Sequence, residues 1–310
     1  MKGFLVAVIL FAAVSPALAA QKGKPVYWSL TPAVFNKAAK SHGGAGEVRF
    51  TPIFGTPDFA TNMRAISRGE LPPGSGIGEH VHRNMEEIFI ILNATAQFTV
   101  NGRTAELPPG AMVICPKGAS HGIYNQNADV SLDWLYFAVS MERDKWDAVD
   151  FGEDLAHKTV ESPAPFLWTV LDRRLLKPAK NAHGGKGDIL FRRCWNKDSF
   201  KTNWEFIDHC ILPPGTSIGY HQHNMIEEVY FLVSGNGRAT VNDTTWEVKA
   251  GDAIPCTSGD SHGLFNSSNR EIELIVFSAA VEKGARNEKD RGDDLTNRSV
   301  TKETPNLMLK

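Results

Sequence analysis

Short apolar runs separated by turn residues form the main pattern along the chain. Examples are IFIIL (88–92), AMVIC (111–115), VYFLV (229–233) and LIVF (274–277), which are bounded by Gly, Pro and Asn. Runs of this length, recurring about every ten residues, are typical of strands joined by tight turns. A helical period of 3.6 residues is suggested only by a short stretch at 33–40. The pattern therefore predicts an all-β protein made of sandwiches or barrels.

The pattern also repeats within the chain. Adding 141 to the residue number takes His80 to His221, and 31 of the 84 positions in 42–125 match an identical residue without a gap. Farther along, the offset becomes 140, so that FGEDL (151–155) aligns with RGDDL (291–295). A repeat of this length indicates an internal duplication, and we expect two equivalent barrels in tandem.

A proline-rich junction, Ser162-Pro163-Ala164-Pro165, lies between the two copies. We therefore place one domain at 21–162 and the other at 163–310. The polar end of the second copy, residues 284–304, matches 144–160 of the first. This match predicts that both polar tails are structured, either against their own barrel or against the other half.

The first 20 residues, MKGFLVAVILFAAVSPALAA, have the features of a secretory signal peptide. Lys2 supplies a positive charge, residues 4–14 form an apolar segment, and Ala17-Leu18-Ala19 fits an A-x-A cleavage site. The apolar segment is shorter than the roughly 20 residues that a membrane span needs. We therefore expect a protein that is periplasmic or secreted after cleavage of residues 1–20.

Composition narrows the range of partners. The formal net charge is −2, with 42% hydrophobic and 22% charged residues, which is ordinary for a globular protein and unlike a nucleic-acid binder. No other segment resembles a membrane span, so we expect neither nucleic acid nor membrane as a partner. Exposed sheet edges would favour a homo-oligomer. Of the four cysteines, Cys194 and Cys210 could pair across a hairpin, and buried free thiols fit equally well.

Each half carries three histidines and a glutamate at identical spacing. The two sets are His80, His82, Glu87 and His121, and His221, His223, Glu228 and His262. Residues i and i+2 of a strand point to the same side, so the histidines of each H-x-H point together. A tight turn would return the glutamate beside them on the next strand, and the last histidine follows 34 residues later. Three imidazoles and one carboxylate form an N3O site for a divalent first-row metal, with coordination positions left open. Glu86 and Glu87 face opposite ways on a strand, so they are not expected to share a site.

The segments around these residues resemble the two motifs of the cupin family. GSGIGEHVHRNMEE resembles the first motif, G-x5-H-x-H-x3–4-E-x6-G, and GAMVICPKGASHGIYN matches every fixed position of the second, G-x5-P-x-G-x2-H-x3-N. The second half supplies GTSIGYHQHNMIEEVYFLVSG and GDAIPCTSGDSHGLFN. Ala94 replaces the closing glycine of one motif, and Thr257 replaces the proline of another. Both departures affect turns and leave the metal ligands in place.

The resemblance identifies the chain as a bicupin and implies two jelly-roll barrels. Each barrel would hold Mn, Fe, Ni, Cu or Zn, so up to two divalent ions per chain are expected. The family implies a metal-dependent enzyme acting on a small organic molecule, by dioxygenase-type chemistry or by metal-assisted acid/base chemistry as an isomerase, lyase or decarboxylase. The alternative is a non-catalytic, metal-stabilised protein that binds a sugar or small acid. Oxalate decarboxylases of this family typically carry an arginine three residues before H-x-H, where this chain has Ile77 and Ile218, which argues against oxalate chemistry.

Residues beside the ligand sets distinguish the two halves. If Glu87 and Glu228 point inward, alternation also brings Phe89 and Tyr230 into the pockets. Tyr230 is the candidate catalytic residue, because its phenol could act as acid, base or hydrogen-bond donor. The alternative is a core position with a tethered hydroxyl. Phe89 lacks a hydroxyl, so it can only fill space in the N-terminal pocket.

Two further pairs of residues are repeated. Arg68 and His209 are equivalent, and they could either meet an anionic substrate or point to solvent. His42 and His183 each begin an HGGxG segment, for which we expect a structural role or a contact at the rim between the halves.

Overall fold

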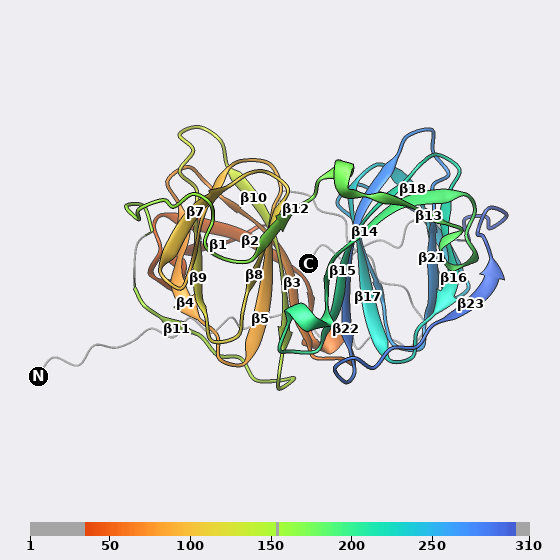
Figure 1. Ribbon diagram of the computed structural model, residues 1–310, viewed down its shortest axis with the longest axis horizontal. Helices are drawn as coiled ribbons and strands as arrows, with labels where there is room; N and C mark the ends of the chain where they lie inside the picture. The colour runs from red at the N-terminus through yellow and green to blue at the C-terminus, as the bar shows by residue number, and fades with distance from the viewer. Residues whose placement is uncertain (1–34, 153–154, 302–310) are drawn as a thin grey trace, which may run out of the picture.

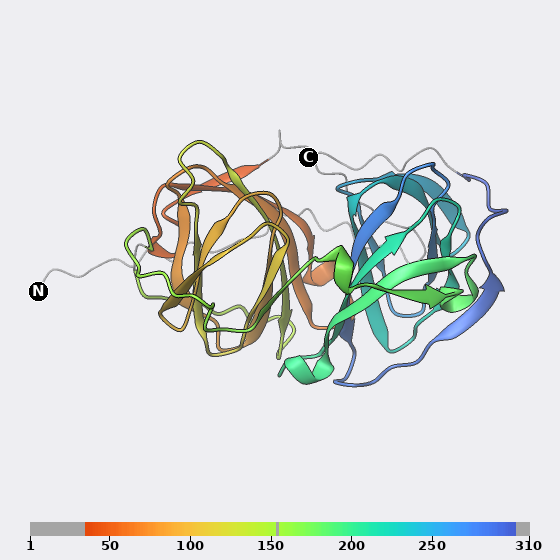
Figure 2. The same ribbon diagram turned by 45° about the horizontal axis from the view of Figure 1, so that its top comes forward.

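The computed structural model describes residues 35–152 and 155–301, and these form two antiparallel β-barrels. The N-terminal barrel appears in red to yellow and the C-terminal barrel in green to blue (Figure 1). A second view shows the two barrels side by side, each with strands arranged around its own interior (Figure 2). The prediction of an all-β protein with two tandem barrels is confirmed. The expected signal peptide at 1–20 lies outside the described residues.

Two sheets make up the N-terminal barrel. The larger sheet contains, in spatial order, β1 (Asn36–Ala39), β2 (Glu47–Gly55), β3 (Met63–Leu71), β10 (Leu132–Ser140), β5 (Met85–Ile91), β8 (Ala111–Cys115) and β12 (Trp168–Val170). The smaller sheet contains β11 (Val149–Asp150), β4 (Gly76–Val81), β9 (Ser120–Tyr124), β6 (Ala96–Val100) and β7 (Arg103–Leu107). The stretch at 33–40 that suggested a helical period is a strand where it is described, because β1 pairs with β2.

The C-terminal barrel repeats this arrangement. Its larger sheet contains β13 (Lys177–Lys180), β14 (Asp188–Asn196), β15 (Trp204–Leu212), β22 (Ile272–Ala280), β17 (Ile226–Ser234) and β20 (Ala253–Cys256). Its smaller sheet contains β19 (Thr244–Lys249), β18 (Asn236–Val241), β21 (Ser261–Phe265), β16 (Ser217–Gln222) and β23 (Lys289–Asp293).

Helical structure in the described residues is limited to short 3-10 turns. They are η2 (Ser41–Gly43), η3 (Thr56–Asp58), η4 (Arg173–Leu175), η5 (Ala182–Gly184) and η6 (Lys197–Ser199). Within that part of the chain, none is long and apolar enough to cross a membrane.

The connection between the barrels and the polar tails both add strands. β12 follows the proline-rich junction at 162–165, yet it pairs with β8, so the chain stays on the N-terminal barrel as far as Val170. The tails contribute β11 and β23, which pair with β4 and β16 beside the first ligand histidines. The expectation that the tails pack on a barrel is therefore confirmed for their described part.

A shared hydrophobic core joins the two barrels. It combines side chains from the larger sheets of both halves, including Ile88, Leu135, Val229 and Ile275. Phe137 and its equivalent Phe277 stack on one another across this interface, with ring centroids 3.4 Å apart and an interplanar angle of 16°. Aromatic burial of this kind favours a fixed arrangement of the two halves.

Glu86 and Glu227, the glutamates next to the expected metal ligands, cross this interface in opposite directions. The carboxylate of Glu86 accepts hydrogen bonds from the backbone of Lys201 and Thr202 at 2.7–3.1 Å. The carboxylate of Glu227 accepts from the backbone of Ala60 and Thr61 at 2.9 and 2.7 Å. Both glutamates are almost fully buried. Of the two adjacent glutamates in each half, one therefore points to the other barrel and the other points into its own barrel, as strand alternation predicted.

All four cysteines lie in the described residues and are free thiols. The pairing of Cys194 with Cys210 that the sequence allowed is therefore not found. In the pairing of β14 with β15, Cys210 lies opposite Phe191, and Cys194 falls in an irregularity of the register.

Candidate metal centres

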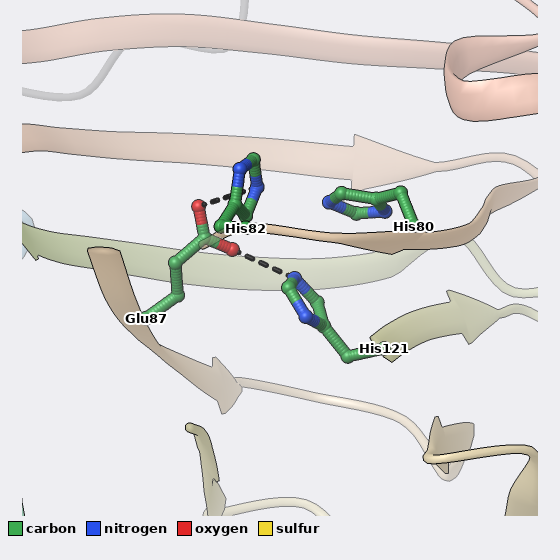
Figure 3. A group of neighbouring side chains, drawn as sticks. All are labelled: His80, His82, Glu87 and His121. Atoms are coloured by element: carbon green, nitrogen blue, oxygen red, sulfur yellow. Dashed lines mark hydrogen bonds and ion pairs between the residues drawn. The ribbon is translucent and has the colours of Figure 1, made fainter. Parts of the chain in front are cut away.

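The four expected ligands of the N-terminal half converge inside their barrel (Figure 3). His80 lies on β4, His82 follows that strand, Glu87 lies on β5 and His121 on β9. The pairing of β4 with β9 places His80 directly opposite His121. Their ligand atoms all lie within 4.8 Å of one another, and the four side chains are buried. The fold thus brings together residues that are 41 positions apart in sequence.

The C-terminal half repeats this geometry. His221 on β16 lies opposite His262 on β21, His223 follows β16, and Glu228 lies on β17. The carboxylate of Glu228 is 3.2 Å from Nε2 of His223 and 3.5 Å from Nε2 of His262. Donor atoms that share one ion at about 2.1 Å lie about 3 Å apart, so this spacing suits a common metal.

Backbone carbonyls hold the ring orientation of the paired histidines. Nδ1 of His80 lies 2.9 Å from the carbonyl oxygen of Gly78, and Nδ1 of His221 lies 2.8 Å from that of Gly219. His82 contacts the carbonyl of Asp147, and His223 contacts that of Asn287 at 3.0 Å. Each carbonyl accepts a hydrogen bond from the N–H at Nδ1, which leaves Nε2 of the same ring free for a metal. The polar tails supply two of these four carbonyls.

Burial and the charges of neighbouring ligands shift the pKa values of histidines and glutamates at both centres. Burial, followed by the neighbouring histidines, lowers the pKa of His80 and of His221 well below the usual value, so both rings are neutral near pH 7. Burial alone would raise the pKa of Glu228, but the close contact with His223 outweighs it and brings the pKa to about 2. The same balance lowers the pKa of Glu87, through His82 and His121. Metal binding requires neutral imidazoles around an ionised carboxylate. Burial alone would lower the pKa of His223, but Glu228 outweighs it and raises the pKa, so a metal ion would displace the proton that this ring favours.

Three buried ring nitrogens of the ligand histidines lack a hydrogen-bonding partner among the described residues: Nε2 of His223, Nδ1 of His121 and Nδ1 of His262. Nε2 of His223 is inaccessible and makes no hydrogen bond with any described residue, although the carboxylate of Glu228 is near. A buried nitrogen without a partner is costly, and a metal ion would satisfy it. The donor set and its geometry therefore fit one divalent ion in each half, up to two per chain.

A family model for the cupin domain matches the sequence twice, at residues 67–137 and 208–278. Each match contains a complete ligand set. A protein of Thermotoga maritima named as an oxalate-binding protein is 32% identical over 96 residues, which cover 31% of this chain and 79% of that protein. The chain belongs to the cupin family. Because the domain occurs twice, it is a bicupin.

Other relatives extend the comparison without adding an activity. An uncharacterized protein of Methanocaldococcus jannaschii is 26% identical over 93 residues, covering 30% of this chain and 74% of that protein. Among solved structures, the Bacillus subtilis oxalate decarboxylase studied for its Mn(II) centres superposes with a TM-score of 0.58 at 15% identity, covering 86% of this chain and 79% of that one. A formate complex of Lactobacillus farciminis oxalate decarboxylase gives a TM-score of 0.61 at 14% identity, with 86% and 89% covered. At these identities the structures demonstrate a shared bicupin fold.

The bicupin contains one feature of its metal centres that sequence reasoning missed. His42 stacks flat on His80, with centroids 3.8 Å apart at 9°, and His183 stacks on His221 at 3.8 Å and 8°. Nδ1 of His42 lies 2.5 Å from a carboxylate oxygen of Asp150. His183 forms the same contact with Asp290 at 3.1 Å. Both histidines therefore belong to the surroundings of the metal ligands, not to a rim between the halves.

The backbone at these histidines is unusual in both copies. His42 and His183 adopt left-handed φ angles of 51° and 52°, which residues other than glycine rarely do. A side chain at Gly78 would collide with the carbonyl oxygen of His42, so the close approach of this loop to β4 requires glycine. The repeat of HGGxG was the available signal in the sequence. Only the fold reveals what the segment touches.

The pocket linings of the two barrels differ. Tyr230 is buried, and its ring centroid is 5.1 Å from that of His262. Its hydroxyl makes no hydrogen bond with the described residues, so the tether expected for a core tyrosine is not found there. Burial, followed by the charge of Glu228, raises the pKa of Tyr230 well above its usual value, which favours the protonated phenol. Phe89 occupies the equivalent place 6.0 Å from His121.

Arg68 and His209 lie outside the ligand clusters and pair with carboxylates on neighbouring strands. Nη2 of Arg68 donates to Asp133 at 2.9 Å, and Nε2 of His209 contacts Glu273 at 2.7 Å. His209 is also completely buried. These partners give both residues a structural explanation, and neither is placed to meet a ligand at the metal.

Proposed function

We propose that this bicupin binds a small organic acid at its metal centres and acts on it as a metal-dependent enzyme. The observation that carries the proposal is that both halves retain complete, buried N3O sets with pre-oriented imidazoles. Such a set leaves coordination positions for the oxygens of a carboxylate or enediol. The relative named as an oxalate-binding protein supports an acid as the ligand.

A bound divalent ion would polarise ligand oxygens and stabilise negative charge that develops on them. Around it, the chain's own residues supply orientation and proton transfer. Tyr230, which stays protonated at neutral pH because of its raised pKa, would donate a hydrogen bond or a proton at its hydroxyl. Oxygenation, isomerisation, elimination and decarboxylation are all compatible with these groups.

Oxalate decarboxylation in particular has a specific objection. Ile77 and Ile218 occupy the positions at which oxalate decarboxylases typically carry an arginine, and both isoleucines are buried. An apolar side chain there cannot pair with an oxalate carboxylate. We therefore propose a small acid as the substrate class and leave the reaction to assay.

A binding protein without turnover is the second candidate, favoured by the name of the Thermotoga maritima relative, an oxalate-binding protein. Metal-loaded protein incubated with oxalate, malonate, keto acids, uronates, catechols and flavonols would separate the two. Conversion of any of these, lost together with the metal, supports the enzyme. Saturable binding without conversion or oxygen consumption supports the binding protein, and absence of both contradicts the proposal.

We further propose that the protein is exported, because residues 1–20 resemble a cleaved signal peptide. Mass spectrometry of the protein recovered from the periplasm or medium of its own cells tests this. A mature chain beginning near residue 20 supports export, whereas an intact Met1 in the cytoplasmic fraction contradicts it.

A further inference from the structure

Two guanidinium groups meet on one aromatic ring at the C-terminal metal centre. The ring is that of Phe206, which is buried and packs in the same core cluster as Tyr230. The guanidinium carbon of Arg193 lies 4.2 Å from the ring centroid, and that of Arg286 lies 5.2 Å from it. Contacts of this kind hold a cation in place without neutralising its charge.

Both arginines are placed by elements that also shape the metal centre. Arg193 on β14 forms two hydrogen bonds of 2.9 Å with the carboxylate of Asp208 on β15. In the larger sheet, Phe206 on β15 lies opposite Ser278 on β22, and Ser278 lies opposite Glu228 on β17, so the ring under both arginines is two strands from the metal ligand. Arg286 directly precedes Asn287, whose carbonyl holds the ring of His223.

The two arginines still have donors to offer. Arg193 uses Nε and Nη2 for Asp208, and Arg286 uses Nη2 for Glu288 at 2.6 Å. Among the described residues, Nη1 of Arg193 and both Nε and Nη1 of Arg286 have no hydrogen-bonding partner. The side chains are 34% and 31% exposed, whereas the metal ligands are almost inaccessible. Both guanidinium groups are therefore partly open to solvent.

The N-terminal barrel lacks this arrangement. Its equivalents of Arg193, Phe206, Asp208 and Arg286 are Pro52, Ala65, Ser67 and Trp146. One guanidinium does lie near its metal centre, where Arg64 stacks over Trp146 at 5.3 Å. Arg64 is a single cation on an aromatic surface, and its Nη1 donates to Thr56 at 2.8 Å. The paired guanidinium groups are thus specific to the C-terminal pocket.

We propose that Arg193 and Arg286 form an anion-binding subsite of the C-terminal pocket, which holds a carboxylate of a small acid whose other oxygens face the metal position. Two cations that keep free N–H groups beside a metal centre recognise a ligand with negative charge at both ends, such as a small dicarboxylate. The inference rests on the proposed function, because it specifies the ligand class at the same site.

The test is calorimetric titration of the full mature chain, loaded with Mn2+, using oxalate and malonate as probes and neutral oxamide as the uncharged control. The measurement uses a His82→Ala background, so that only the C-terminal ligand set is complete. Arg286→Gln and Arg193→Lys are each expected to weaken binding of the dicarboxylates about ten-fold. Arg103→Gln, which removes the same charge from an exposed ion pair with Glu161, is expected to change it less than two-fold. Arg286→Gln keeps the test valid if Arg193→Lys disturbs folding around Asp208.

The outcomes separate this inference from the proposed function. Dicarboxylate binding that is weakened by the two variants and is accompanied by no binding of oxamide supports the subsite. Dicarboxylate binding that both variants leave within two-fold overturns the subsite and leaves the proposed function standing. Absence of dicarboxylate binding, in both the His82→Ala background and the unsubstituted chain, contradicts the proposed function and the subsite with it. In a His223→Ala background, Arg286→Gln should have no effect, and a ten-fold effect there would also overturn the assignment.

Discussion

The two barrels of this bicupin hold the same metal ligands in nearly the same geometry. The side chains that line the space around these ligands differ between the barrels. In both, three histidines and one glutamate meet on matching strands, and a further histidine stacks on the first ligand. The walls differ at Phe89 and Tyr230, and again where Trp146 in one half corresponds to Arg286 in the other. The metal shells have stayed alike while the linings have diverged.

This difference indicates where the function of each half is decided. A change in a ligand or in the group that orients it removes the metal, so the duplicate sets tolerate little variation. A change in the lining alters which ligand fits and leaves the metal in place. The N-terminal pocket, with Phe89, Trp134 and Tyr136 in mutual contact, is aromatic. The C-terminal pocket carries its phenol at Tyr230 instead and adds two guanidinium groups, so we expect the halves to differ in ligand more than in metal.

Removal of a metal ligand should have the largest effect, because it should empty one of the two metal centres and leave the other occupied. His82→Ala and His223→Ala should each remove one metal equivalent per chain, and the double variant should remove both. The loss of affinity should exceed the roughly 10- to 100-fold that follows from removing an outer hydrogen-bond partner. Elemental analysis after dialysis measures this, with the exposed His157→Ala as control. Retention of full metal content in the double variant would contradict the assignment of both sites.

Substitution of the crossing glutamates should reveal whether the two halves depend equally on one another. Glu86→Gln and Glu227→Gln each weaken a buried carboxylate that accepts backbone hydrogen bonds from the other barrel. Each should lower the free energy of unfolding by about 2 kcal/mol. Urea denaturation measures this, with the exposed Glu247→Gln as the matched control. If only one variant lowers the free energy of unfolding, the two equivalent sets of hydrogen bonds contribute unequally to the stability of the interface.

Removal of the stacked histidines should have a smaller effect, confined to one barrel at a time. His42→Ala should weaken metal binding about ten-fold in the N-terminal site alone, and His183→Ala should do so in the C-terminal site alone. Competition with a chelator, in backgrounds that retain a single site, measures both. His42→Phe keeps the stacked ring and loses the contact with Asp150, so it separates packing from hydrogen bonding. Equal losses in both sites from one variant would indicate a global effect on folding.

The exchange of the lining residues should leave metal binding unchanged, and its effect on turnover should be no larger than the effect of the stacked histidines on metal affinity. Tyr230→Phe should reduce turnover or ligand affinity about ten-fold, because it removes one hydrogen-bond donor from the pocket. Phe89→Tyr should leave the rates within two-fold if the C-terminal centre is the active one. Steady-state assays on the metal-loaded variants measure this, with metal content determined in parallel. Unchanged rates in Tyr230→Phe would remove Tyr230 from the chemistry.

The sequence by itself determined the duplication, the β class and the eight candidate ligands, because each shows as a periodic pattern or as a motif repeated at a constant offset. Alternation along a strand makes His80 and His82 point together, and the turn that follows returns Glu87 to them. An identical set at a constant offset excludes coincidence. These features need no knowledge of distant contacts.

The tertiary structure decided what lies beyond the ligands. His42 is 38 residues from His80 in sequence, and only the packing of its loop on β4 stacks the two rings. Glu86 accepts hydrogen bonds from the other barrel, and Arg193 and Arg286 both contact the ring of Phe206. These contacts also depend on how the strands close into barrels. Such contacts join residues whose separation in sequence follows no period, so no pattern along the chain could predict them.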